Sequence, residues 1–288
     1  MKTPATLTVS LGEARASATG ELVRTAFGDL HVVVRGAGPA LVLVHGVTDS
    51  SSTWHAVQAG LAGEARVLAI DLPGHGLSDI PKKPLSIAEM GSAVVEVLRV
   101  MDVRGAVVCG NSLGGGVVIA VAQQAPERVR ALVPLCSLGA PFRMPFDLGL
   151  LRFRSIARTI PWIGARPRLR RFMMRSAYHR GFVPSDEDLD RYFAGWRVRG
   201  RARYVAALVR SVDVAEPHGW LASLAVPTHV VHGDEDRLIP PFVARELAAR
   251  IPGARLTIMP RTGHEPHVEQ PIETIALLRG ELRGIAGA

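Results

Sequence analysis

The feature that most constrains the fold is a regular alternation of short apolar runs with longer segments of helical periodicity. The apolar runs are Leu41–Val44, Val67–Ile70, Ala106–Cys109, Ala131–Leu135, His229–Val231 and Arg255–Met259, and the helical segments are Ile87–Met101, Leu113–Gln124, Pro241–Arg250 and Ile272–Leu282. Another strand, Leu30–Arg35, is expected before the turn Gly36–Pro39. Several runs are continuous, which is typical of strands buried on both faces of a parallel sheet. The alternation therefore predicts an α/β fold, a mostly parallel twisted sheet flanked by helices.

Composition supports a folded domain and excludes several classes of protein. The 288 residues are 48% hydrophobic and 21% charged, which is enough apolar content for a large core. No uncharged apolar run of about 18 residues is present, so no transmembrane helix is expected, and the first twenty residues lack the apolar block of a signal peptide. Two cysteines, Cys109 and Cys136, are too few for a disulfide framework or a structural zinc site. We expect a cytoplasmic protein with buried thiols and no metal.

One segment, residues 139–225, interrupts the alternation. It separates two predicted strands by about 85 residues, far more than an ordinary crossover connection contains. We interpret it as an inserted helical cap, with the core formed by residues 20–138 and 226–288 and with a leader, residues 1–19, that need not be well ordered. The two junctions of the cap lie at the carboxyl edge of the predicted sheet, where open α/β sheets bind ligands.

The excess positive charge of the chain lies in this predicted cap. Residues 139–225 contain 16 Arg, no Lys and 7 acidic residues, a net charge of +9, whereas the other residues carry 18 basic and 19 acidic side chains. A solvated surface is the ordinary outcome of such a composition. Two alternatives stay open: peripheral contact with anionic membrane lipid or a partner, and binding of an anionic substrate such as a carboxylate or a CoA thioester. No nucleic-acid-binding motif accompanies the arginines, so no nucleic-acid partner is expected.

A serine lies between a predicted strand and a predicted helix, in the sequence Gly110-Asn111-Ser112-Leu113-Gly114. A sharp turn between a strand and a helix needs small flanking residues, because larger side chains would collide with neighbouring backbone. Such a turn holds the serine at the top of the sheet, next to the N–H groups of the helix N-terminus. The pattern therefore predicts that Ser112 is a nucleophile.

A serine nucleophile needs a base, and the base needs a carboxylate that orients it. His264 follows the last predicted strand, and Asp236 follows the strand before it. The order Ser112, Asp236, His264 is the one that this architecture uses, and all three residues lie in loops at the carboxyl ends of strands. His267 is the alternative base, and Asp234 is the alternative acid.

Two backbone N–H groups are expected to stabilise the oxyanion that forms when a serine attacks a carbonyl. One belongs to Leu113, directly after the nucleophile, and the other to Val47, which follows the strand Leu41–Val44 in the sequence His45-Gly46-Val47.

Several ordered motifs carry a family resemblance. They are His45-Gly46, Asp71-Leu72-Pro73-Gly74-His75-Gly76-Leu77-Ser78, Gly110-Asn111-Ser112-Leu113-Gly114-Gly115, Gly233-Asp234-Glu235-Asp236 and Gly263-His264. From residue 30 to residue 288 the chain resembles the α/β-hydrolase superfamily, specifically its cap-bearing branch of serine esterases, haloperoxidases and C–C hydrolases. The resemblance implies the α/β-hydrolase fold. It also favours Asp236 over Asp234 as the acid, and it implies that His45 orders the oxyanion loop.

The residues and the resemblance together predict a cofactor-independent serine hydrolase. It would cleave a carboxylic ester, or a related carbonyl compound, of a small apolar substrate through an acyl-enzyme on Ser112. C–C bond hydrolysis or haloperoxidase/perhydrolase chemistry with the same three residues is the alternative, and a non-catalytic ligand receptor on this fold is a further one. C–C hydrolases often carry a Gly- and Ser-rich stretch after the His-Gly pair, and here the chain instead reads Val47-Thr48-Asp49-Ser50-Ser51-Ser52-Thr53-Trp54, which contains no glycine.

The apolar side chains of the cap are expected to shape the substrate pocket. The candidates are Phe142, Met144, Phe146 and Trp162.

Overall fold

A single mixed sheet forms the centre of the computed structural model, which describes residues 8–16, 18–143 and 149–284. The strands in this part of the chain are β1 (Glu21–Thr25), β2 (Gly28–Arg35), β3 (Ala40–Val44), β4 (Arg66–Ile70), β5 (Ala106–Asn111), β6 (Val129–Leu135), β7 (His229–Gly233) and β8 (Arg255–Met259). Their spatial order is β1-β2-β4-β3-β5-β6-β7-β8. The pairs β1–β2 and β2–β4 are antiparallel, and all the others are parallel. The predicted mostly parallel sheet is confirmed.

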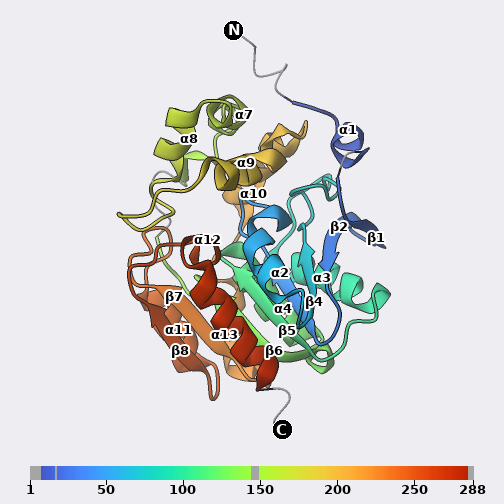
Figure 1. Ribbon diagram of the computed structural model, residues 1–288, viewed down its shortest axis with the longest axis vertical. Coiled ribbons are helices and arrows are strands. Elements are labelled where there is room, and N and C mark those ends of the chain that lie inside the picture. The colour runs from blue at the N-terminus through green and yellow to red at the C-terminus, as the bar shows by residue number, and fades with distance from the viewer. Residues whose placement is uncertain (1–7, 17, 144–148, 285–288) are drawn as a thin grey trace.

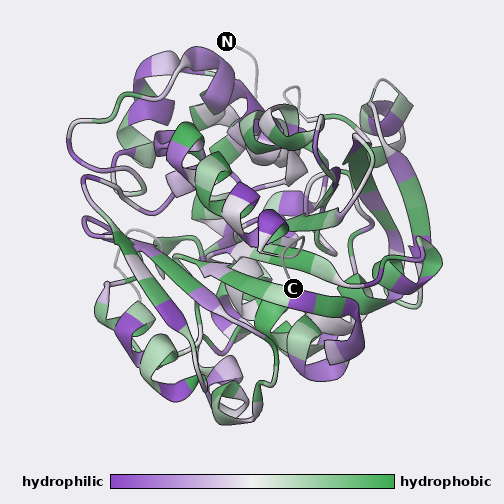
Figure 2. Cartoon of the chain, turned by 60° about the horizontal axis from the view of Figure 1, so that its bottom comes forward, coloured by the Kyte–Doolittle hydropathy of each residue, from purple (hydrophilic) through white to green (hydrophobic). Residues whose placement is uncertain are grey.

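Both faces of the sheet are covered, and the central strand β3 shows why. Val42 and Val44 point into one apolar core, and Leu41 and Leu43 point into another on the opposite face. All four side chains are fully buried, so the strand needs a continuous apolar run rather than an alternating one. In Figure 2 the strands are mostly green, whereas purple gathers on the outer surfaces of the helices.

Helices cover the sheet in two layers (Figure 1). One face packs against α3 (Ile87–Val100), α4 (Leu113–Gln124) and α11 (Phe242–Arg250), and the other against α2 (His55–Leu61) and α13 (Pro271–Arg283), which follows the short α12 (Pro266–Glu269). Helix α3 begins with a capping box: the Ser86 hydroxyl accepts from the N–H of Glu89, and the Glu89 carboxylate accepts from the N–H of Ser86.

A helical insertion lies between β6 and β7. Its helices are α6 (Arg154–Ala157), α7 (Ile160–Gly164), α8 (Pro167–Met174), α9 (Asp186–Ala194) and α10 (Arg201–Ser211). They gather at one end of the sheet (Figure 1) and enclose a small apolar core that includes Leu189, Phe193 and Trp196. The indole N–H of Trp196 donates to the carbonyl of Thr48 at 2.9 Å, which fixes the insertion to the loop after β3. The inserted helical region that the sequence predicts is therefore present.

Several described elements lie outside the strands and helices that the sequence predicts, the short helix α12 among them. Strand β1 exposes most of its residues and buries only Val23, so it has no apolar run to reveal it. Helix α2 is only seven residues long. In the leader, α1 (Leu11–Ala16) buries no side chain, and Val9 forms an isolated parallel bridge with Val198 of the insertion.

Two further expectations are met within the described residues. Cys109 and Cys136 are both buried free thiols. No described helix has the length and apolarity needed to cross a lipid bilayer.

Candidate active site

Ser112 occupies a strained turn between β5 and α4. Its φ of 57° and ψ of −118° lie in a region that residues other than glycine rarely adopt. The flanking glycines are needed for space: a Cβ on Gly110 would lie 2.2 Å from the carbonyl oxygen of Gly114, and a Cβ on Gly114 would lie 2.4 Å from that of Val44. Strain of this kind costs about 1–3 kcal/mol and marks functional positions.

Ser112 and His264 share a cavity of about 100 Å³ beneath the insertion. On the core side Gly46, Val47 and Asp49 line it, and on the cap side its wall includes Leu151, Met173, Met174, Ala177 and Tyr192. A Cβ on Gly46 would lie 3.7 Å from the Ser112 hydroxyl oxygen, so glycine at this position keeps the space beside the serine open.

Asp236 holds His264 by a direct hydrogen bond. Nδ1 of His264 lies 2.8 Å from Oδ2 of Asp236, and Oδ1 of Asp236 accepts from the N–H groups of Leu238 (2.8 Å) and Ile239 (2.9 Å). Burial alone would raise the pKa of Asp236, but His264 and a hydrogen bond from His232 hold this pKa well below its usual range. The carboxylate is therefore ionised and oriented at neutral pH.

The two alternative residues lie elsewhere. Asp234 is exposed, and its Oδ1 accepts from the N–H of Thr262 at 3.2 Å. His267 is fully buried and stacks on Trp54, with ring centroids 4.0 Å apart. Burial lowers the pKa of His267 to about 3, so its ring is neutral. Neither residue takes part in the contact between Asp236 and His264.

The peptide that carries the Val47 N–H is fixed by His45. Nδ1 of His45 donates to the carbonyl of Gly46 at 2.7 Å, while Nε2 accepts from the N–H of Leu72 at 3.0 Å. Because a trans peptide is planar, holding the Gly46 carbonyl also fixes the opposite direction of the Val47 N–H. Burial lowers the pKa of His45, which keeps this ring neutral.

The Leu113 N–H differs from that of Val47 in its surroundings. Leu113 is the first residue of α4, so its N–H has no acceptor within the helix. Its side chain is buried in the core, and among the described residues it is not part of the cavity wall.

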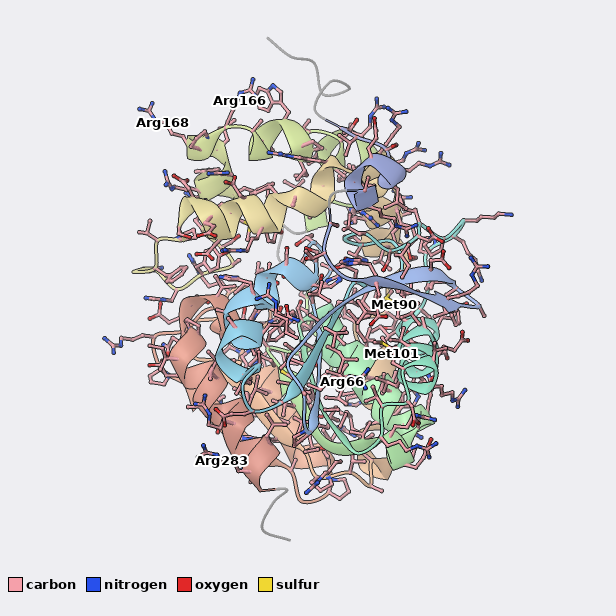
Figure 3. All side chains as sticks on the ribbon, turned by 45° about the vertical axis from the view of Figure 1, so that its right-hand side comes forward. Arg66, Met90, Met101, Arg166, Arg168 and Arg283 are labelled. Carbon is pink, nitrogen blue, oxygen red and sulfur yellow. The ribbon has the colours of Figure 1, made fainter. Side chains whose placement is uncertain are left out.

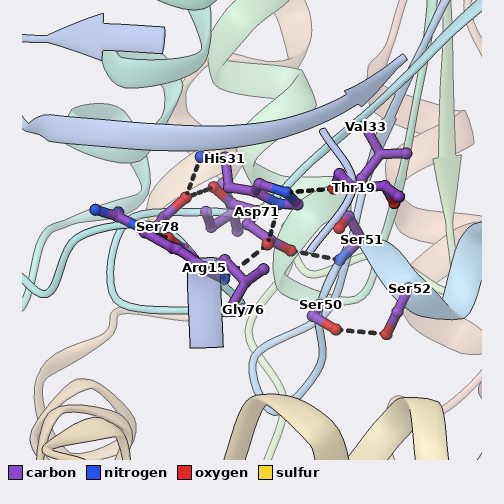
Figure 4. Close-up of polar contacts among 12 residues, drawn as sticks. Arg15, Thr19, His31, Val33, Ser50, Ser51, Ser52, Asp71, Gly76 and Ser78 are labelled. Atoms are coloured by element: carbon purple, nitrogen blue, oxygen red, sulfur yellow. Dashed lines mark hydrogen bonds and ion pairs between the residues drawn. The ribbon is translucent and has the colours of Figure 1, made fainter. Parts of the chain in front are cut away.

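Asp71 joins the loops after β3 and β4 to strand β2 (Figure 4). Its Oδ1 accepts from the N–H of Ser51 at 2.6 Å, and its Oδ2 accepts from the N–H of Leu77 at 2.8 Å and lies 2.9 Å from Nδ1 of His31. Burial opposes ionisation, but these bonds, led by that of His31, keep the pKa of Asp71 well below its usual range. Asp71 therefore has a structural role in holding the loops after β3 and β4.

Glu269 is a candidate positioning residue that sequence reasoning missed. Its carboxylate accepts from the N–H groups of Gly263 (3.0 Å) and Glu265 (3.1 Å), the two residues that flank His264. It also accepts from the N–H of His179 in the insertion at 2.7 Å. One side chain thus links the loop that carries His264 to the cap. Helix α12 is only four residues long and carries no motif that would have indicated this role.

Replacing Glu269 by glutamine is expected to lower kcat about tenfold while changing KM little. Glutamine keeps one acceptor oxygen but brings an NH₂ group against the backbone donors around His264, and one such hydrogen bond to a charged group is worth about 1.5–3 kcal/mol. Steady-state ester kinetics test this, with Glu273→Gln on the exposed side of α13 as the matched control. An unchanged kcat in Glu269→Gln would contradict the positioning role.

The two predicted substrate-pocket residues that the structure describes, Phe142 and Trp162, are not part of the cavity wall. Phe142 packs against the main core, and the Trp162 ring lies under the guanidinium of Arg166, 3.6 Å from its centroid. Met144 and Phe146 lie outside the described residues. The described part of the cap instead contributes other residues to the wall, among them Leu151, Met173, Met174, Ala177 and Tyr192.

No described arginine of the cap is part of the cavity wall. Residues 149–184 contain nine Arg and no acidic residue, and Arg166 and Arg168 project outward from the insertion (Figure 3). Phe153 and Phe172 are exposed on the same segment. No described Arg or Lys lines the cavity, and the carboxyl groups of its wall are those of Asp49 and Glu265. The hypothesis that these arginines bind an anionic substrate gains no support at the cavity.

Two buried groups of side chains have the donor atoms of a metal site, each with its atoms within 4.8 Å of one another: Cys136, His232 and Asp236, and Asp49, Glu265 and His267. In the first group, Nε2 of His232 lies 2.8 Å from the carbonyl of Ile239 and therefore carries the hydrogen, and Asp236 is engaged by His264. In the second group, Oε2 of Glu265 and both ring nitrogens of His267 have no hydrogen-bond partner among the described residues, and this group is considered below.

A mostly parallel sheet with a helical insertion, and with a serine on a glycine-flanked turn after strand β5, defines an α/β-hydrolase. The sequence profile of the Alpha/beta hydrolase family matches residues 41–277. The chain therefore belongs to this family.

Curated relatives and solved structures agree with this assignment. The chain is 29% identical over 260 residues to the pimeloyl-[acyl-carrier protein] methyl ester esterase of Nitrosomonas europaea, covering 86% of this chain and 97% of that protein. It is 31% identical over 255 residues to a 2-hydroxymuconate semialdehyde hydrolase of a Pseudomonas species, covering 84% and 86%. The structure of a thermophilic esterase from Thermogutta terrifontis has the same fold, with a TM-score of 0.76, 24% identity and 93% and 99% coverage.

Proposed function

We propose that this protein hydrolyses a carboxylic ester, without a cofactor, through an acyl-enzyme on Ser112. The observation that carries the proposal is the shared cavity: the strained serine and a histidine already bonded to a buried carboxylate both line it. The esterase among the relatives supports the choice of an ester as substrate.

The chemistry assigns one role to each group. His264 takes the proton of the Ser112 hydroxyl as the serine oxygen attacks the ester carbonyl. Asp236 keeps the Nδ1 hydrogen of His264 in place and stabilises the imidazolium. The N–H groups of Val47 and Leu113 stabilise the oxyanion of the tetrahedral intermediate. His264 then protonates the departing alcohol, and water repeats the sequence to release the acid.

The size of the cavity predicts short acyl groups. A volume of about 100 Å³ has room for roughly seven to ten water molecules, at about 10–15 Å³ of such cavity volume each. We therefore expect kcat/KM on p-nitrophenyl esters to be highest between acetyl and butyryl and to fall at least tenfold by octanoyl. A panel from acetyl to palmitoyl tests this, and an optimum at long chains would contradict the proposed size of the acyl site.

Hydrolysis of a carbon–carbon bond is the second candidate, because a relative 31% identical to this chain is a 2-hydroxymuconate semialdehyde hydrolase. The substrate of that relative is a carboxylate, whereas the cavity wall here includes the carboxyl groups of Asp49 and Glu265 and no described Arg or Lys. Labelling of Ser112 by a fluorophosphonate without turnover of any ester would favour this candidate. If Ser112 is not labelled and no ester is turned over, a receptor without catalytic activity would be favoured.

A further inference from the structure

Two carboxyl groups line the catalytic cavity without a role in the proposed mechanism. Asp49, in the loop after β3, is 4% exposed, and Glu265, directly after His264, is 7% exposed. Both contribute to the cavity wall beside Ser112. Their oxygens and a ring nitrogen of the fully buried His267 lie within 4.8 Å of one another.

This pair of acids has no cationic partner among the described residues. No Arg or Lys forms an ion pair with either carboxyl group, and the nearest basic group to Glu265 is Nε2 of His267 at 3.4 Å. Oε2 of Glu265 has no hydrogen-bond partner, although only 9% of the side chain is exposed. Burying an unpartnered acidic group is unfavourable unless a proton or a cation compensates it.

The ionisation of the pair reflects this missing positive charge. Burial raises the pKa of Asp49 to about 7, even though the Thr53 hydroxyl and the Ser50 N–H donate to its carboxylate. Burial and the neighbouring Asp49 raise the pKa of Glu265 well above its usual range. A cation placed between the two carboxyl groups would replace the proton that they otherwise hold.

The surroundings favour an ammonium group over a metal ion. A histidine that binds a metal almost always donates its other ring N–H to a carboxylate, a carbonyl or water. Nδ1 of His267 meets no such partner in the described chain, and its ring lies flat on Trp54. An ammonium group has three donors and needs only acceptor oxygens, which Asp49 and Glu265 provide at the edge of the cavity.

We propose that Asp49 and Glu265 form a subsite for a protonated amine that the substrate carries close to its scissile carbonyl. The inference rests on the proposed ester hydrolysis and specifies its substrate class. Because Ser112, His264 and both carboxyl groups line one cavity of about 100 Å³, the amine lies within a few bonds of the carbonyl, as in a small amino-acid ester. Substrates with a carboxylate at the same place are repelled.

A matched pair of esters isolates the charge. Alanine methyl ester and methyl isobutyrate differ by an ammonium group in place of a methyl group. The ratio of their kcat/KM values is compared between wild type, Asp49→Asn and Glu265→Gln, so that the intrinsic reactivity of the two esters cancels. We expect the ratio to fall about tenfold or more in each variant, because a hydrogen bond to a charged group is lost.

Glu235→Gln is the matched control, since Glu235 lies in the loop of Asp236 but outside the cavity wall. Its ratio is expected to equal that of wild type. An unchanged ratio in both Asp49→Asn and Glu265→Gln would overturn the subsite. So would a stoichiometric divalent metal in the purified wild type that the two variants lack, because the carboxylates would then be metal ligands.

Calorimetric titration of isopropylammonium chloride into the resting protein, with sodium chloride as the reference, separates the two proposals. Binding in wild type that weakens about tenfold in Asp49→Asn supports the subsite even if no ester is turned over, in which case only the proposed function fails. Equal heats for the two salts would overturn the subsite even if esters are hydrolysed.

Discussion

Ser112→Ala is expected to lower kcat for ester hydrolysis by at least about 10³-fold, and up to about 10⁶-fold. Alanine removes the oxygen that would form the acyl-enzyme while leaving the backbone of the turn and the cavity wall in place. Ester turnover on a short acyl substrate measures the loss, in a preparation free of host esterases.

Ser92→Ala is the matched control for this substitution. Ser92 lies on α3 outside the cavity wall, and its hydroxyl donates to the carbonyl of Ala88 and to Gln124. Its activity is expected to stay within twofold of wild type. Full activity in Ser112→Ala, with Tm unchanged, would show that another group is the nucleophile.

Asp236→Asn is expected to lower kcat by roughly 10³–10⁴-fold with little change in KM. The Asn amide would present an NH₂ group or a weaker neutral oxygen to His264, so the ring is no longer held with its hydrogen on Nδ1. The lone pair that should take the Ser112 proton is then lost. Loss of the ionised carboxylate also removes the stabilisation of the imidazolium.

Asp234→Asn is the matched control, two residues away on the same loop. The Asp234 carboxylate accepts only from the N–H of Thr262 at 3.2 Å, and an Asn oxygen preserves this bond. We expect more than half of the wild-type kcat to remain. The reverse pattern, an active Asp236→Asn and an inactive Asp234→Asn, would reassign the acid.

Much of the fold is predictable because its central strands appear in the sequence as apolar runs. The run Leu41–Val44 is continuous since β3 is buried on both faces, and α4 begins and ends at the residues that its apolar pattern indicates. Strand β1 could not be found in this way, because an edge strand that buries only Val23 has no apolar period. Its position depends on pairing with β2, which sequence patterns do not encode locally.

The residues of the candidate site also differ in how clearly the sequence indicates them. Motifs mark Ser112, Asp236 and His264 because each lies at a strand end with a characteristic turn sequence. No motif indicates Glu269, Asp49 or Glu265. Their roles depend on contacts that form only where the loops after β3 and β8 meet the cap.

The wall of the cavity was the least predictable part. Apolar residues of the cap are equally suited to its own core, to the main core or to the cavity, and composition does not distinguish these places. Phe142 packs against the main core and Trp162 under Arg166, while Met173 and Met174 line the cavity.

The central claim is a covalent intermediate on Ser112, and rapid-quench mass spectrometry tests it most directly. The protein is mixed with p-nitrophenyl acetate, quenched in acid within the first turnover and digested. We expect one acetyl group on the peptide that contains Ser112, formed at the rate of the p-nitrophenol burst and absent in Ser112→Ala. Steady turnover that persists in Ser112→Ala, with no acetyl group on that peptide in the wild type, would contradict the account.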